Sequence, residues 1–139
     1  MTYKNLIRVL PFLTMTAVLS LLILGASSAQ TKSPKPFTTQ LSDTTSDYQR
    51  VFEGPPQTIS MHSGLVVLAA SKSVGKHSTK DYEEAVVVFA GTGEFRITGG
   101  PTLSLTPNSV VYCPPNTEHD VVNTGTQTLR YLYIASKHK

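Results

Sequence analysis

From Tyr48 onward, the chain consists of short apolar runs separated by close turn signals, and this spacing limits the fold more than any other feature. Glycine, proline and asparagine interrupt the runs too often for helices, and several runs alternate polar and apolar residues. The pattern predicts an all-β sandwich or barrel of about nine or ten short strands. We expect strands near residues 50–52, 58–61, 65–70, 84–89, 94–97, 102–105, 109–113, 119–123 and 129–135.

The first 29 residues have the order of a cleavable secretory signal. Lys4 and Arg8 form a positive start, residues 9–25 are mostly apolar, and Ser27-Ser28-Ala29 supplies the small residues of a cleavage site. The apolar run is short for a membrane span, although an uncleaved anchor is the alternative. The pattern predicts a signal peptide over 1–29 and an exported protein, periplasmic or secreted, with no membrane segment after cleavage.

Cleavage would leave residues 30–139, a length that suits one domain. Residues 30–47 are rich in serine, threonine, proline, lysine and glutamine and lack hydrophobic periodicity, so we predict a flexible tether there. The barrel domain is then 48–139. The leader holds 2 of the 12 basic residues and none of the 9 acids, so the net charge of the remainder is 12 − 2 − 9 = +1. With no basic run left, nucleic-acid binding is not expected.

Two motifs in this domain carry residues typical of metal ligands. In the first, His77 and Glu84 precede Gly91, with six residues between the glutamate and the glycine. In the second, Pro114, His119 and Asn123 follow one another at set intervals. The order and spacing resemble the two motifs of the cupin superfamily, and the resemblance covers roughly residues 60–135.

The sequence departs from the family pattern at four positions. Thr79 stands where the first motif has a second histidine, and Ser71 stands at its first glycine. Asn108 and Asn116 replace two glycines of the second motif. Asparagine is the next-best residue after glycine at positive φ, so we expect these turns to be kept.

The resemblance implies a double-stranded β-helix, or jelly roll, whose motif side chains point into the mouth of the barrel. It also implies a metal site formed by His77, Glu84 and His119. A 2-His-1-carboxylate set suits Fe, Mn, Zn or Ni and does not distinguish among them. Burying Glu84 unpaired on an apolar strand would be costly, which also favours a cation. Because Thr79 replaces a ligand, the alternative is a vestigial site without metal.

The reaction does not follow from the fold, since cupins host many chemistries. Our first hypothesis is an exported single-domain cupin that binds a divalent metal and a small polar ligand, with oxygenase, isomerase or lyase activity all open. The alternative is a non-catalytic module that binds a sugar or an organic acid. Pairing through exposed barrel edges would favour a homodimer.

Other residues receive more ordinary interpretations. Cys113 is alone, so no intramolecular disulfide can form, and we expect it in the core. Tyr112, Tyr131 and Tyr133 are predicted to lie in the core or the cavity wall. Residues 84–89 are apolar at alternate positions on both faces and are predicted to be buried on both. His62 is a candidate replacement for the missing ligand, and His138 is expected in solvent.

Overall fold

The computed structural model describes residues 33–45 and 47–138. The predicted signal peptide lies outside these residues. Among those described, no helix is long and apolar enough to cross a membrane. The described residues form nine strands and no helix, which confirms the predicted all-β class. The strands are β1 (Tyr48–Glu53), β2 (His62–Leu68), β3 (His77–Ser78), β4 (Tyr82–Ala90), β5 (Gly93–Ile97), β6 (Thr102–Leu105), β7 (Val110–Cys113), β8 (Glu118–Val122) and β9 (Leu129–Lys137).

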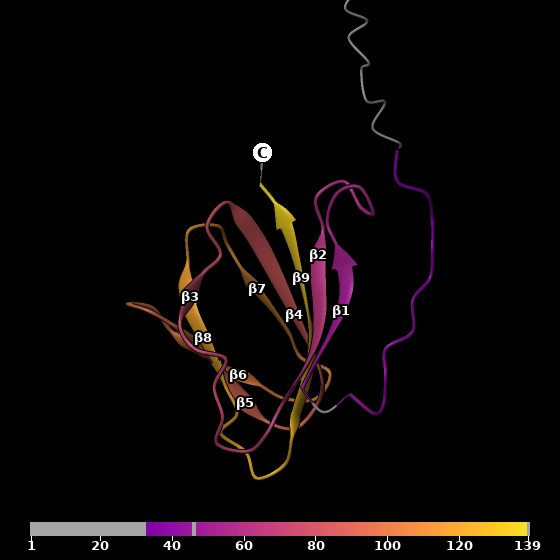
Figure 1. Ribbon diagram of the computed structural model, residues 1–139. Helices are drawn as coiled ribbons and strands as arrows, with labels where there is room; N and C mark the ends of the chain where they lie inside the picture. Colours follow the sequence, from indigo (N-terminus) through magenta and orange to yellow (C-terminus); the bar gives the residue numbers. More distant parts are fainter. Residues whose placement is uncertain (1–32, 46, 139) are drawn as a thin grey trace, which may run out of the picture. The chain divides into compact units, whose positions relative to one another are not determined.

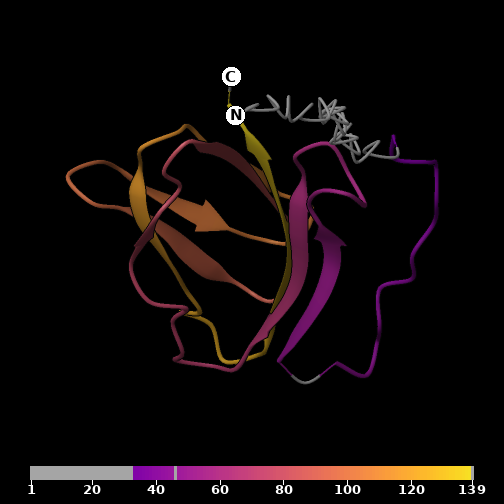
Figure 2. The same cartoon turned by 45° about the horizontal axis from the view of Figure 1, so that its top comes forward.

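The strands form two antiparallel sheets that lie opposite one another (Figures 1 and 2). The five-stranded sheet has the order β1-β2-β9-β4-β7, and the four-stranded sheet has the order β3-β8-β5-β6. Neighbours in each sheet are mostly distant in sequence, as in a jelly roll. The core lies between the sheets and receives alternate side chains from both. Its buried members are Val86, Val88, Phe95, Leu105, Val111, Cys113, Val121, Leu129 and Tyr131.

The prediction of a strand at 58–61 is wrong, because the structure has turns and bends there. Thr58 donates its backbone N–H to the Gly54 carbonyl, and its hydroxyl donates to the Met61 carbonyl. These hydrogen bonds stay within the turns and bends of this segment and do not join a neighbouring strand. β2 begins only at His62. β3, in contrast, was not expected. It has only two residues, too few for a pattern, and exists because His77 and Ser78 pair with β8.

The prediction that residues 84–89 are buried on both faces is also wrong. Val86 and Val88 are buried, but Phe89 on the other face is 38% exposed, with the Arg130 guanidinium carbon 5.3 Å from its ring centroid. Tyr112, predicted in the core or cavity wall, is 60% exposed on the edge strand β7. One face of this sheet therefore packs on the core, while the other meets solvent.

The turns at the motif glycine positions keep the left-handed backbone that the resemblance implies. Asn108 has a φ of 68° and Asn116 a φ of 56°, which confirms that asparagine serves there. Ser71, at the remaining substituted position, has a φ of 62°. The three replacements therefore keep the turns that precede β3, β7 and β8. Two of these strands, β3 and β8, carry the motif histidines.

Residues 33–45 contain no strand or helix but contact the barrel. Phe37 packs edge-on against Phe52 of β1 at 5.7 Å between ring centroids. The Gln49 side chain accepts from the Ser42 N–H at 2.7 Å and donates to the Gln40 carbonyl at 2.9 Å. The flexible tether over 30–47 stays a prediction, and residues 30–32 and 46 lie outside the described residues.

Candidate metal centre

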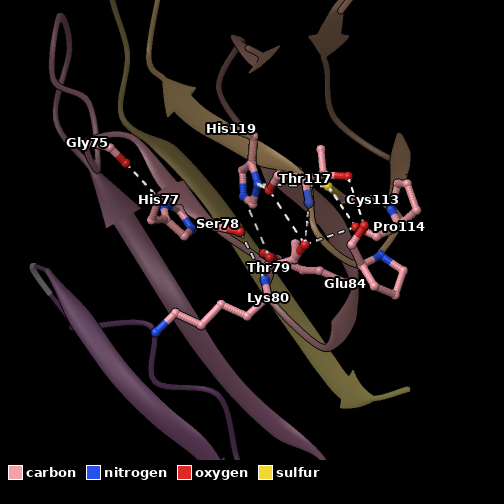
Figure 3. Close-up of polar contacts among 11 residues, drawn as sticks. Gly75, His77, Ser78, Thr79, Lys80, Glu84, Cys113, Pro114, Thr117 and His119 are labelled. Carbon is pink, nitrogen blue, oxygen red and sulfur yellow. Dashed lines mark hydrogen bonds and ion pairs between the residues drawn. The ribbon is translucent and has the colours of Figure 1, made fainter. Parts of the chain in front are cut away.

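Three strands bring the predicted ligands His77, Glu84 and His119 together (Figure 3). His77 of β3 lies directly opposite His119 of β8 in the four-stranded sheet. Glu84 of β4 comes from the facing sheet, where it pairs with Cys113 and Ala135. One ligand atom from each of the three residues lies within 4.8 Å of the others. His119 thus meets His77 and Glu84, which lie 42 and 35 positions before it in the sequence.

His119 is fully buried and carries an unused nitrogen. Its ring stacks on Phe95 at 4.4 Å, and its Nδ1 lies 3.3 Å from the Thr117 carbonyl, which can only accept. A proton on Nδ1 would satisfy this carbonyl, and the Cys113 Sγ lies 3.8 Å from the same nitrogen. Nε2 has no hydrogen-bond partner and lies 3.6 Å from the Glu84 Oε2. Buried polar atoms without a partner are rare, and a lone pair aimed at a carboxylate suits a shared cation.

His77 has the same proton arrangement, although it is exposed. Its Nδ1 lies 2.9 Å from the Gly75 carbonyl oxygen. A carbonyl only accepts, so Nδ1 donates and Nε2 keeps its lone pair. The His77 and His119 ring centroids are 4.3 Å apart. Both rings therefore offer an unprotonated Nε2 at one place, which is the state that a metal ion requires.

Burial opposes charge on both Glu84 and His119. It raises the pKa of the Glu84 carboxyl, and the nearby His77 offsets this in part. It lowers the pKa of the His119 imidazole, with His77 adding to the effect. The Glu84 carboxylate and the neutral His119 form a poor ion pair at neutral pH. A divalent cation would satisfy both groups at once.

In metal-free protein, Glu84→Gln should become more stabilising as the pH rises. The raised pKa means that the folded wild type favours the protonated carboxyl, so its stability is lost as the pH rises through that pKa. The glutamine variant does not titrate. Urea unfolding with chelator should show the wild type losing stability relative to Glu84→Gln as the pH rises above the ordinary pKa of a glutamate carboxyl. A difference that does not change with pH would contradict this.

Thr79, at the position of the missing histidine, is a structural residue. It is 7% exposed, and its hydroxyl donates to the Pro114 carbonyl at 2.9 Å. The same oxygen accepts from the Thr117 N–H at 2.9 Å. These bonds fasten the end of β3 to the turn before β8 (Figure 3). The hydroxyl proton is therefore already used and is not available to a metal-bound water.

The other motif and candidate residues lie away from the three ligands. Asn123 is buried, and its amide donates to the Leu68 and Gln127 carbonyls while its oxygen accepts from the Gly125 N–H, so it fixes a turn. His62 lies on the cavity wall, 5.7 Å from Tyr82 between ring centroids, and is not in the group, so it does not replace the missing ligand. His138 is exposed, as predicted.

A cavity of about 700 Å³ is lined by two of the three ligands, His77 and Glu84. Tyr131 and Tyr133 line it, which confirms their predicted place in the wall. Tyr48 also lines it, and its hydroxyl lies 3.0 Å from that of Tyr133. The Tyr48 ring lies against Gly64, where any side chain would collide with it. Tyr48 was not among the predicted site residues, although a glycine within a strand is a sequence signal of close approach.

The comparisons with known proteins concern both sequence and fold. The family model described as a cupin domain matches residues 64–135. A search of curated proteins finds no match. A protein from Bacillus halodurans has a TM-score of 0.64 and 17% identity, with 76% of this chain and 84% of that chain covered. The cupin domain of Cnp3 from Schizosaccharomyces pombe has a TM-score of 0.58 and 18% identity, covering 65% and 63%. At these identities the two likenesses show the fold alone.

The structure of DMSP lyase DddQ from Ruegeria pomeroyi also matches, with a TM-score of 0.50 and 25% identity. It covers 55% of this chain and 38% of the lyase chain. This chain therefore spans less than two thirds of both the Cnp3 domain and the lyase. The family model covers more than half of the chain, and the observed sheets agree with it. The chain therefore belongs to the cupin family.

Proposed function

We propose that this protein is an exported cupin that binds one divalent metal ion through His77, Glu84 and His119 and accepts a small uncharged ligand in the adjoining cavity. The observation that carries the metal proposal is the buried His119 Nε2, which has no hydrogen-bond partner and faces Glu84. The signal-like order of residues 1–29 supports export. A mature chain beginning near Gln30 would be the corresponding result by mass spectrometry.

The two histidines would bind through Nε2, because each Nδ1 proton is held by a backbone carbonyl. Glu84 would supply the carboxylate oxygen. A bound ion would provide Lewis-acid chemistry, and three protein donors would leave coordination positions for water or substrate. Fe, Mn, Zn and Ni all fit this donor set. Elemental analysis of protein purified without chelator tests the proposal, and about one metal ion per chain is expected.

The cavity wall supports an uncharged ligand over an organic acid. Among the described residues, the wall contains the acids Asp47 and Glu84 and neither lysine nor arginine. Arg50 lines a second, smaller cavity. Tyr131 is 3% exposed and lines the main cavity, and its hydroxyl has no hydrogen-bond partner among the described residues. Tyrosine rings with a free hydroxyl suit the faces and hydroxyl groups of a sugar.

Uncharged sugars should bind the metal-free protein at least about tenfold more tightly than the matching uronic acids. The described wall contains two acids and neither lysine nor arginine, so without metal it offers an anion no permanent cation. Calorimetric titration of a panel of such pairs gives the comparison. Tyr131→Phe should weaken binding of the sugars, while Phe89→Leu, on the outer face, should not. Preferential binding of the uronic acids would contradict the ligand proposal.

Metal and ligand binding do not by themselves imply catalysis. Because one matched structure is named as a lyase, lyase chemistry is the first class to assay with metal-loaded protein. If the purified protein holds no metal under any condition, the non-catalytic binding module with a vestigial site becomes the better description. Thr79 in place of the second histidine is the feature that favours that second candidate.

A further inference from the structure

His77 needs support from outside its own strand. β3 has only two residues, and both are exposed. A side chain that is not packed can rotate freely, and ordering it to bind metal would cost conformational entropy. Besides the His119 ring, the contact that restrains His77 comes from residues 73–76, the loop that precedes it.

The carboxylate of Asp120 on β8 holds this 73–76 loop. The Ser73 hydroxyl lies 2.8 Å from Asp120 Oδ1 and 2.6 Å from Oδ2, and the Gly75 N–H donates to Oδ1 at 3.0 Å. The Gly75 carbonyl in turn accepts from His77 Nδ1 at 2.9 Å. A single residue, Gly75, thus lies between the carboxylate and the imidazole, bonded to Asp120 through its N–H and to His77 through its carbonyl.

The backbone at Gly75 makes this connection possible. Its φ is +88°, a conformation that side chains disfavour but glycine adopts easily. The Val74 N–H also donates to the Val121 carbonyl at 3.1 Å. This bond holds the loop to β8 at the residue that follows Asp120. The loop is exposed, yet its position is fixed by side-chain and backbone bonds to the strand that carries the second histidine ligand.

We propose that Asp120 is a positioning residue, which acts through Ser73 and Gly75 to hold His77 in the Nδ1-protonated form with Nε2 free for metal. The part that concerns metal affinity rests on the proposed function, whereas the part that concerns the proton position does not. In metal sites, partners that orient a ligand histidine commonly change metal affinity by about 10–100-fold.

Nitrogen-15 NMR of the histidine rings, recorded with chelator at about pH 8, tests the proton position without any metal. In the wild type, His77 should show a proton on Nδ1. In Asp120→Ala, the Gly75 peptide loses its anchor, and His77 should become a mixture of the two neutral forms. Ser73→Ala should change in the same direction, and it provides a second variant should Asp120→Ala fold poorly. An unchanged His77 spectrum in both variants would overturn the inference.

Competition with a fluorescent chelator, using Zn²⁺ as the probe, tests the consequence for affinity. Asp120→Ala should bind about 10–100-fold more weakly than the wild type, and Asp120→Asn, which keeps an acceptor oxygen, should lose less. Glu118→Ala is the matched control, because Glu118 flanks His119 on the other side and its side chain has no hydrogen bond or ion pair among the described residues. Glu118→Ala removes the same charge as Asp120→Ala, and its zinc affinity should stay within about threefold of that of the wild type.

The outcomes separate this inference from the proposed function. If Glu118→Ala and Asp120→Ala weaken zinc equally, the effect is one of charge, and the positioning role is wrong. If the wild type binds no metal, the proposed function fails, but the NMR comparison still decides whether Asp120 sets the proton on His77. If zinc binds and Asp120→Ala binds it as tightly as the wild type, the inference fails while the metal site stands.

Discussion

His119→Ala is expected to abolish the stabilisation that a divalent metal gives this protein. A metal that binds only the folded chain adds about 2.7 kcal/mol at a concentration of 100 Kd, which for a domain of this size raises the melting temperature by roughly 10 °C or more. His119 supplies the buried Nε2 that faces Glu84, so its loss removes the central donor. Thermal unfolding with and without Zn²⁺ measures the shift in each variant.

Two further variants, His77→Ala and His138→Ala, serve as comparisons for the metal-induced shift in melting temperature. Because His119 stacks on Phe95 in the core, His119→Ala also lowers the stability of the metal-free protein, and only the shift caused by metal is informative. His77→Ala removes an exposed ligand and should lose most of the shift with little loss of metal-free stability. His138→Ala, an exposed histidine away from the site, should keep the full shift. A full shift in His119→Ala would refute the assigned ligand set.

Thr79→Val is expected to lower the free energy of unfolding by about 1–3 kcal/mol, although the two side chains have nearly the same shape. The valine leaves the Thr117 N–H and the Pro114 carbonyl without the partner that the hydroxyl provides. These two hydrogen bonds are partly buried, and each typically contributes about 0.5–1.5 kcal/mol to stability. Thr79→Ser keeps the hydroxyl and should lose less than about 1 kcal/mol, mainly from the missing methyl group.

Urea unfolding of the metal-free proteins distinguishes these two variants. Equal stability of Thr79→Val and the wild type would show that the two hydrogen bonds of the Thr79 hydroxyl are unimportant.

The same geometry bears on restoring the second histidine of the family motif. Thr79→His would place a fourth donor near the ligands, but it would lose the hydrogen bonds of the Thr79 hydroxyl to Pro114 and Thr117. We therefore expect the histidine variant to lose stability in the absence of metal, whatever affinity it gains.

Much of the fold could be predicted because it depends on local patterns. Strands with clear alternation, such as β5 and β6, were expected close to where they lie. The ligands His77, Glu84 and His119 could be named from motif register alone. The stretch 58–61 failed because a hydroxyl and a backbone N–H form turn bonds that apolar patterning does not reveal.

The supporting contacts could not be predicted, because they join residues far apart in sequence. Asp120 and Ser73 are 47 positions apart, and nothing in either segment marks them as partners. The role of Thr79 likewise depends on carbonyl and N–H groups at Pro114 and Thr117, which every residue or nearly every residue possesses. The exposure of Tyr112 follows from β7 being a sheet edge, a property of strand order and not of local sequence.

The burial of Cys113 links the redox chemistry of this chain to its folding. The thiol is fully buried, and burial raises its pKa, so little reactive thiolate forms in the folded protein. Under the proposed export, the protein would meet oxidising conditions, in which an exposed lone cysteine would couple to other chains. Here the barrel must open first. Unfolding in such a compartment would then be followed by covalent cross-linking, so the lifetime of the protein would be set by how rarely the barrel opens.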